Sequence, residues 1–552
     1  MLLIKIHLRF TIMIGKNLQS PSEQENHDTQ LFVFKVLLKY NNDLMEDLNI
    51  NLSERRCAMK HGFKTSFLKA VALVALTVFV VQTWSFTQDK AAQIDELMKL
   101  YQKHEGFNGT VLVAEGGKVI FKNAYGLANV EWNIPHKPDT KFRLGSITKQ
   151  FTSMLIMQLL NEGKIALEGK LSKYLPYYRK DTGEKVTVHH LLTHSSGIPS
   201  YTSRPDFFQD ISRDPYGVEE FVKKYCSDDL EFEPGKKFAY NNSGYFILGA
   251  IIEEVTGKTY EDALKERIFN PLGMKDTGYD HHDTIMPHRA TGYNLTLDGY
   301  ENAPYLDMSL PYAAGSLYST VEDLYLWDRA LYTEKLLPNK LKEIMFQPHI
   351  KAFGGHYAFG WSINEKKETE SEEKKLHISH GGGINGFNTL IDRQVTDQHL
   401  VVLLNSAPGA SLGSISEGIF NIIYGKPPKE PVESIASVLY QTIKKQDVKA
   451  AIAQYQDLKE KHPKKYNFQP MELIKLGNHL LNKTKDVDGA IEILKLNAEV
   501  NPKFAYTYVS LADAYLKQDK KNLAIKNYAK ALELNPDNTM ILDMLNKAAK
   551  EE

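Results

Sequence analysis

The chain contains 552 residues, which is more than one typical domain of about 100–200 residues accommodates. Hydrophobic residues make up 42% and charged residues 24%, as in ordinary globular proteins, and two cysteines without a Cys-x-x-Cys pair exclude a disulfide framework or a cysteine zinc site. The formal net charge of −1 excludes a global field that would attract nucleic acid or an acidic membrane.

The most apolar run extends from Phe67 to Thr87 and follows a basic segment that begins near Met59. Its uninterrupted core, Ala70 to Val81, is shorter than the about 20 residues that a membrane span needs. A basic segment, an apolar core and small polar residues in this order are typical of a secretory signal peptide. We therefore predict a signal peptide over 59–87 and a periplasmic or secreted protein, with a retained membrane anchor as the alternative.

A signal peptide belongs at the N-terminus of a protein, yet this one begins near residue 59. We therefore interpret Met59 as the start of translation and residues 1–58 as a spurious extension. A mature protein that retains residues 1–58 on N-terminal sequencing would contradict this interpretation. If the interpretation holds, Cys57 is absent and Cys226 is left alone, as expected for an exported protein that needs no disulfide.

Residues 88–425 form one continuous mixed segment. Two β-like runs surround Gly116–Gly117, which predicts a hairpin, and the run from Phe151 to Gly163 is apolar nearly all round, which predicts a buried helix. Lys375–Gln394 and His399–Ser406 again have the pattern of strands. Strands near both ends with helices between them predict an α+β domain whose terminal strands share one sheet.

The C-terminal part contains a repeat. Residues 426–431 are rich in proline and predict a stiff linker to residues 432–552. Asn501–Pro502 recurs as Asn535–Pro536 at a period of 34 residues, which resembles a tetratricopeptide repeat. The matching positions are Tyr508, Leu511, Ala512, Tyr515, Ala524, Tyr528, Ala531 and Pro536. The prediction is an all-α repeat module that binds a protein partner, with a generic helical tail as the alternative.

Ser146 and Lys149 form a Ser-x-x-Lys pair at the entrance of the predicted buried helix. Free N–H groups and the helix dipole there favour a developing alkoxide, and one helical turn brings the lysine beside the serine oxygen. A partly desolvated lysine has a lowered pKa and can accept the serine proton. Alone the pair is weak, because Ser66 and Lys69 repeat it inside the predicted signal peptide, and without further residues the pattern favours a capping serine.

Tyr240 and Asn242 form a Tyr-x-Asn pair on a loop just before a second apolar helix. A phenolate beside an ammonium is a plausible proton relay, and an asparagine amide can hold both a substrate carbonyl and the lysine. Tyr40–Asn42 and Tyr300–Asn302 have the same spacing but lack the preceding Pro-Gly and the following helix. A core tyrosine with a satisfied hydroxyl is the alternative for Tyr240.

His380, Gly381 and Gly382 lie on a predicted strand, where glycines let a substrate backbone approach closely. The N–H of Gly383 is expected to join that of Ser146 as an oxyanion hole. A glycine-rich hairpin turn is the alternative interpretation.

The order Ser-x-x-Lys, Tyr-x-Asn, His-x-Gly resembles the serine β-lactamase and penicillin-binding protein-like family, in particular its class C and esterase-like branch. The resemblance spans about residues 90–425. It implies a β-lactamase/transpeptidase-like fold, with an antiparallel sheet, flanking helices and a helical subdomain, and acyl transfer through an acyl-serine. It also implies Ser146 as nucleophile, Lys149 and Tyr240 as the proton-transfer pair, Asn242 as a positioning amide, and no cofactor. Which of Lys149 and Tyr240 is the first base stays open.

His380 departs from the lysine that usually begins the third motif in β-lactamases. Because an unperturbed histidine is mostly neutral at pH 7, it is a poor partner for a penicillin-like carboxylate. His380, Gly382 and Gly383 are therefore expected to bind an ester, an amide or a D-amino-acid peptide. We expect the activity of an esterase, a D-aminopeptidase or a D-alanyl-D-alanine carboxypeptidase, with a β-lactam left open.

A polar cluster, His281, His282, Asp283 and His288, lacks the His-x-His-x-Asp spacing of a zinc hydrolase, so no metal is expected. His194, in the run LLTHSSG, is structural in the family that the sequence resembles. The rival hypothesis is a catalytically silent cell-wall or peptide-binding protein with the repeats as an adaptor. The intact set of Ser-x-x-Lys and Tyr-x-Asn residues favours the enzyme.

Overall fold

The computed structural model describes residues 89–367, 374–536 and 538–550. The predicted extension over 1–58 and the predicted signal peptide over 59–87 lie outside these described residues, so both stay predictions. Within the described ranges, no helix combines the length and the apolarity that a membrane crossing needs.

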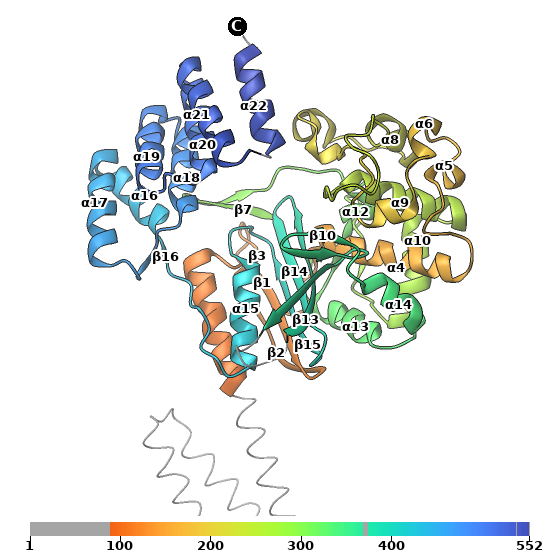
Figure 1. Ribbon diagram of the computed structural model, residues 1–552. Coiled ribbons are helices and arrows are strands. Elements are labelled where there is room, and N and C mark those ends of the chain that lie inside the picture. Colours follow the sequence, from red (N-terminus) through yellow and green to blue (C-terminus); the bar gives the residue numbers. More distant parts are fainter. Residues whose placement is uncertain (1–88, 368–373, 537, 551–552) are drawn as a thin grey trace, which may run out of the picture. The chain divides into compact units, whose positions relative to one another are not determined.

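An antiparallel sheet of eight strands joins the beginning and the end of the segment that precedes the linker (Figure 1). β1 pairs with β15, with Gly109 opposite Asn405, and β1 also pairs with β2 through a turn at Gly116–Gly117. The predicted hairpin and the sharing of one sheet by the terminal strands are thus observed. The strand order is β10 (Ile350–Ala352), β11 (Gly355–Tyr357), β12 (Ser362–Lys367), β13 (Lys374–Ile384), β14 (Phe387–Gln394), β15 (His399–Asn405), β1 (Gly109–Glu115) and β2 (Lys118–Tyr125).

The two faces of the sheet bury side chains in different cores because successive residues of a strand point to opposite sides. Val111 and Val113 of β1 pack with the helix over 89–105 and with α15 (Leu412–Ile423). Leu112 of β1 belongs instead to the large core shared with the helical part of the domain. Strand alternation therefore places the sheet between two helical layers.

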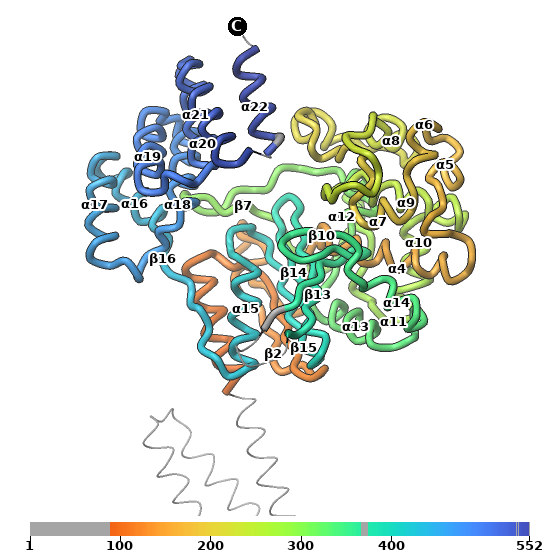
Figure 2. The backbone as a smooth tube through the Cα atoms, in the orientation of Figure 1, coloured from red at the N-terminus to blue at the C-terminus, as the bar shows by residue number. Residues whose placement is uncertain are grey.

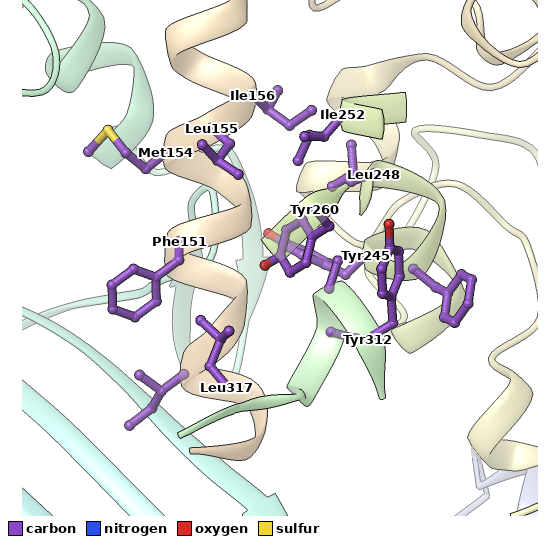
Figure 3. Close-up of a cluster of buried hydrophobic side chains, with 14 of the residues drawn as sticks. Phe151, Met154, Leu155, Ile156, Tyr245, Leu248, Ile252, Tyr260, Tyr312 and Leu317 are labelled. Carbon is purple, nitrogen blue, oxygen red and sulfur yellow. The ribbon is translucent and has the colours of Figure 1, made fainter. Parts of the chain in front are cut away.

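α4 (Thr148–Asn161) is the central helix of the larger core, and its side chains are buried on nearly all sides. Figure 3 shows Leu155 and Ile156 of α4 facing Leu248 and Ile252 of α9 (Asn242–Thr256). The buried helix predicted from the apolar run is thus observed, and it starts three residues earlier than that run.

Shorter elements surround α4 and α9 and close the core. The helices are α5 (Leu171–Tyr174), α6 (Lys180–Gly183), α7 (Val188–Leu192), α8 (Val218–Tyr225), α10 (Tyr260–Leu264), α11 (Asn270–Leu272), α12 (Tyr312–Gly315), α13 (Val321–Leu331) and α14 (Asn339–Phe346). The small strands are β3 (Leu127–Asn129), β4 (Ile134–Pro135), β5 (Phe142–Arg143), β6 (Gly278–Tyr279), β7 (Tyr293–Thr296), β8 (Gly299–Asn302) and β9 (Leu317–Ser319).

The residues after the linker form a helical region with its own core, which Figure 2 lets the reader follow along the chain. Ala512, Ala524 and Ala531 are fully buried, as expected for small residues that let two helices approach closely. The identity of this region as tetratricopeptide-like repeats stays a prediction. Its elements are β16 (Glu433–Ser434), α16 (Ile435–Lys445), α17 (Val448–Lys461), β17 (Tyr466–Asn467), α18 (Pro470–His479), α19 (Val487–Val500), α20 (Ala505–Leu516), α21 (Lys521–Leu534) and α22 (Thr539–Lys550).

The β7–β8 hairpin makes direct contact with this helical region. Asp298, in the turn of the hairpin, accepts hydrogen bonds from the hydroxyl of Tyr440 and from Nε2 of His479, each over 3.0 Å. The neighbouring Leu297 packs against the core of the helical region. The helical region is therefore held by specific contacts in addition to the linker.

Candidate functional site

Ser146 lies in a 3-10 turn, Gly145–Ile147, that leads directly into α4. Lys149 follows one turn later, and its Nζ lies 3.0 Å from Oγ of Ser146. The predicted helical spacing thus brings the two side chains into hydrogen-bond contact, with the serine half-buried and the lysine 0% exposed.

Among the described residues, the hydrogen-bond partners of Lys149 Nζ are a hydroxyl, an amide and a carbonyl oxygen, and none is a carboxylate. Its Nζ lies 2.8 Å from Oδ1 of Asn242 and 2.9 Å from the carbonyl oxygen of Ala314. Burial therefore lowers the pKa of Lys149 well below its ordinary value, because no anion compensates the lost hydration of an ammonium. A neutral amine donates two hydrogens, to Asn242 and Ala314, and its lone pair is left to accept the hydrogen of Ser146.

Tyr240 lies just before α9 and contacts both members of the pair. Its ring centroid is 5.0 Å from Nζ of Lys149. Burial raises the pKa of Tyr240 well above its ordinary value, and a hydrogen bond with Ser146 opposes that rise. The phenol is therefore protonated at neutral pH and can donate a hydrogen bond toward the serine.

Asn242 is the first residue of α9, and the side chain of Asn241 caps that helix by accepting from the N–H of Gly244. The Asn242 Nδ2 donates to Oγ1 of Thr202 over 3.0 Å, while Oδ1 faces Lys149. These two contacts fix the amide orientation, so that its oxygen is held toward the lysine.

Gly383 lies on β13 beside the turn that carries Ser146. A Cβ built on Gly145 would lie 2.9 Å from both N and O of Gly383, and Gly145 has a φ of +55°. Ser146 and Gly383 line one cavity of about 90 Å³, together with Thr202, Leu306 and Asn385. Ser146 and Gly383 therefore line the same cavity although they lie far apart in the sequence, and the oxyanion hole formed by their N–H groups stays a prediction.

Gly145→Ala is expected to lower kcat by about 10²-fold, because the added methyl pushes Ser146 away from Gly383 and disturbs the two-donor geometry. Steady-state hydrolysis of a p-nitrophenyl ester measures this loss. Gly163→Ala is the matched control, since Gly163 also has a positive φ, +71°, but nothing lies within 4 Å of its added Cβ. Equal loss in both variants would mean that backbone strain alone, and not the Gly383 contact, lowers activity.

His380 lies on β13, with its ring centroid 6.2 Å from that of Tyr240. Its Nδ1 is 2.6 Å from the carbonyl oxygen of Gly381, and its Nε2 is 2.9 Å from the hydroxyl of Tyr357. The carbonyl can only accept, so Nδ1 carries the hydrogen and Nε2 accepts from the phenol. Burial and the nearby Lys149 lower the pKa of His380 to about 4, so the ring is neutral at pH 7.

Neither His380 nor Gly382 lines the cavity that contains Ser146. His380 lines a separate cavity of about 370 Å³ with Tyr240 and Phe353. A Cβ built on Gly382 would lie 1.9 Å from the carbonyl oxygen of Leu144, so this glycine lets β13 pass close to the segment before Ser146. The structure therefore explains Gly382 by its close approach to the backbone at Leu144.

His194 holds the segment around Tyr240, a contact that the sequence did not indicate. Its carbonyl oxygen accepts from the N–H of Ala239 over 2.8 Å, and its Nδ1 accepts from the N–H of Asn241 over 3.0 Å. The His194 and Tyr240 ring centroids lie 4.3 Å apart. Both sequence neighbours of Tyr240 thus form hydrogen bonds with His194. These bonds involve backbone groups far apart in the sequence, so the residue types alone did not indicate them.

His194→Phe is expected to lower kcat by about tenfold with little change in KM, because it keeps the ring but leaves the buried N–H of Asn241 unpaired. Steady-state kinetics separates the two constants. His136→Phe serves as the control, since it removes another buried imidazole whose Nε2 contacts Oγ of Ser406. A rise in KM with unchanged kcat would show that His194 does not position Tyr240.

The polar cluster after β6 does not gather around one point. His281 contacts Glu261, whereas His288 contacts Asp139. Among the described residues, no group of three or more His, Cys, Asp or Glu side chains is arranged to hold a metal ion.

A mixed sheet-and-helix domain with a serine and a lysine one turn apart at the start of its buried helix defines the class of β-lactamase-fold serine hydrolases. A family model described as Beta-lactamase matches residues 92–416. The chain therefore belongs to the beta-lactamase family.

The relatives include penicillin-binding proteins and amidohydrolases. "Penicillin-binding protein 4*" of Bacillus subtilis (strain 168) is 29% identical over 381 residues, which cover 63% of this chain and 79% of that protein. A penicillin-binding protein structure from Bacillus halodurans has 27% identity and a TM-score of 0.50, covering 60% of this chain and 97% of that one. A D-stereospecific amidohydrolase structure from Streptomyces sp. has 26% identity and a TM-score of 0.53, covering 60% and 98%.

Proposed function

We propose that the protein is an exported serine hydrolase that acts through an acyl-serine on an ester, an amide or a D-amino-acid peptide. The observation that carries the proposal is the fully buried Lys149, whose Nζ lies 3.0 Å from Oγ of Ser146 and whose pKa is lowered by burial well below its ordinary value. The similarity to a D-stereospecific amidohydrolase and to penicillin-binding proteins supports this range of substrates.

In the proposed reaction Lys149 Nζ takes the proton of Ser146 as Oγ attacks the substrate carbonyl carbon. The N–H groups of Ser146 and Gly383 stabilise the oxyanion. The tetrahedral intermediate collapses when the leaving group receives a proton from the Tyr240 hydroxyl, which Lys149 replenishes. A water then attacks the acyl-serine by the reverse proton path and releases the acid. The phenol of Tyr240 starts protonated, which favours Lys149 as the first base.

Asn242 would position Lys149 and the substrate carbonyl, and His380, Gly382 and Gly383 would line the path of the substrate. A neutral His380 provides no charge for a penicillin-like carboxylate, which favours esters and peptides over β-lactams. The C-terminal helical region would act as a tetratricopeptide-like adaptor for a protein partner, and the protein would work in the periplasm or outside the cell.

Intact mass after exposure to a fluorophosphonate tests the proposed chemistry. A single adduct on the wild-type protein that is lost in Ser146→Ala is the expected result. The absence of an adduct, together with no hydrolysis of p-nitrophenyl esters, would instead favour a silent peptide-binding protein. A panel of a cephalosporin, a short-chain ester and a D-alanyl peptide then identifies the preferred substrate.

A further inference from the structure

A second cavity adjoins the cavity that contains Ser146. It has a volume of about 380 Å³ and shares Leu306 and Asn385 with the Ser146 cavity. Arg143, Arg289 and His282 contribute to its wall. A substrate that extends from Ser146 past Asn385 would therefore enter a space with two guanidinium groups.

The two arginines share one carboxylate. Arg143 donates through Nε to Oδ2 of Asp280 over 2.6 Å, and Arg289 donates to Oδ1 of the same residue. The side chain of Asp280 is fully buried, whereas those of Arg143 and Arg289 are 14% and 28% exposed. The two guanidinium groups and the Asp280 carboxylate have a combined charge of +1. Each guanidinium group also has further N–H donors that can bind the carboxylate of a substrate.

No described residue that lines this cavity is acidic. The carboxylates of Asp283 and Asp307 line a different neighbouring cavity. Nζ of Lys149 is buried and bonded to Asn242 and Ala314, and both ring nitrogens of His380 are bonded within the protein, so neither side chain is free to pair with a substrate anion. The arginine-lined cavity is thus the place next to the serine where a negative group finds complementary charge.

We propose that the cavity lined by Arg143 and Arg289 is a subsite for an anionic group, a carboxylate carried by the ester or peptide that acylates Ser146. The inference rests on the proposed function, because it names the substrate class of the same site. Arg289 is the better position for a substitution. When its guanidinium group is removed, Arg143 still neutralises the buried Asp280.

The kinetic test compares p-nitrophenyl hydrogen glutarate with the p-nitrophenyl ester of monomethyl glutarate, which has the same chain without the charge. In Arg289→Gln the ratio of kcat/KM for the charged over the neutral ester is expected to fall by about tenfold to a hundredfold, the effect of one charge-assisted hydrogen bond. Arg267→Gln, which removes an arginine paired with Glu162, is expected to leave the ratio unchanged. An unchanged ratio in Arg289→Gln would overturn the subsite.

A binding measurement separates this inference from the proposed function because it needs no turnover. Glutarate is expected to raise the melting temperature of the wild type and of Ser146→Ala, but not that of Arg289→Gln. Equal stabilisation of all three proteins, or of none, would overturn the subsite even if ester hydrolysis is observed. Stabilisation by inorganic phosphate but not by glutarate would overturn the assignment to a carboxylate. Stabilisation by glutarate without any hydrolysis would support the subsite and contradict the proposed enzyme.

Discussion

Ser146→Ala is expected to lower the turnover of a p-nitrophenyl ester by about 10⁴-fold or more, because no acyl-enzyme can form without the hydroxyl. Residual hydrolysis would come from the backbone donors alone. The variant is expected to fold like the wild type, since Ser146 is half-buried and the substitution only deletes one oxygen. Pre-steady-state kinetics with the ester in excess measures both the acylation burst and the steady rate.

Ser153→Ala is the matched control for this prediction. Ser153 lies on the same helix, α4, and its hydroxyl is buried against that of Tyr245 at 3.2 Å. Its loss is expected to cost about 1 kcal/mol of stability and to change turnover by less than a few fold. Turnover in Ser146→Ala within tenfold of the wild type would mean that another residue is the nucleophile.

Lys149→Met is expected to lower kcat/KM by about 10³- to 10⁴-fold, because the variant keeps the apolar volume but has no base for the serine proton. In the wild type the amine must be neutral to act. Its pKa is lowered by burial, so kcat/KM is expected to rise with pH and to reach its plateau well below the pKa of an ordinary lysine. A pH profile of kcat/KM measures this limb. A rise that continues up to the pKa of an ordinary lysine would contradict a neutral Lys149.

The same lowered pKa predicts a pH dependence of stability. At pH values between the pKa of Lys149 in the folded protein and its ordinary pKa, the unfolded chain binds a proton on this lysine that the folded chain does not. The contribution of Lys149 to the free energy of unfolding therefore increases as pH rises through this window. The free energy of unfolding of the wild type relative to Lys149→Met is therefore expected to increase with pH in this window.

Lys342→Met is the control for the activity of Lys149→Met, since Lys342 is also buried against carbonyl oxygens and also has a lowered pKa.

Local spacing was enough to predict the arrangement of several site residues. One turn of α4 brings Lys149 to Ser146, whatever the rest of the fold, and Asn242 begins a helix because Asn241 caps it. The apolar runs around Gly116–Gly117 and over His399–Ser406 likewise predicted the strands β1, β2 and β15, which the structure places in one sheet. These features depend on residues that are close in the sequence, so a single sequence is sufficient to predict them.

The remaining features depend on contacts between distant segments. The acceptor carbonyl of Ala314, the support of Tyr240 by His194 and the position of His380 next to Tyr357 follow from packing, and none has a spacing signature. The same holds for Arg143 and Arg289, whose separation by 146 positions hides their shared Asp280. Every residue type has a backbone N–H or carbonyl group, so the sequence does not indicate that the Ala314 carbonyl or the Asn241 N–H takes part in the site.

The pairing of β1 with β15 has a consequence for synthesis of the chain. Ser146, Lys149, Tyr240 and Asn242 leave the ribosome well before Gly383, and β1 can pair with β2 at once but with β15 only after residues 399–405 have emerged. A nascent chain that ends before Lys374 has the serine and the lysine but no Gly383 N–H to hold an oxyanion. Under the proposed mechanism, the growing polypeptide lacks a complete oxyanion hole until β13 has been made.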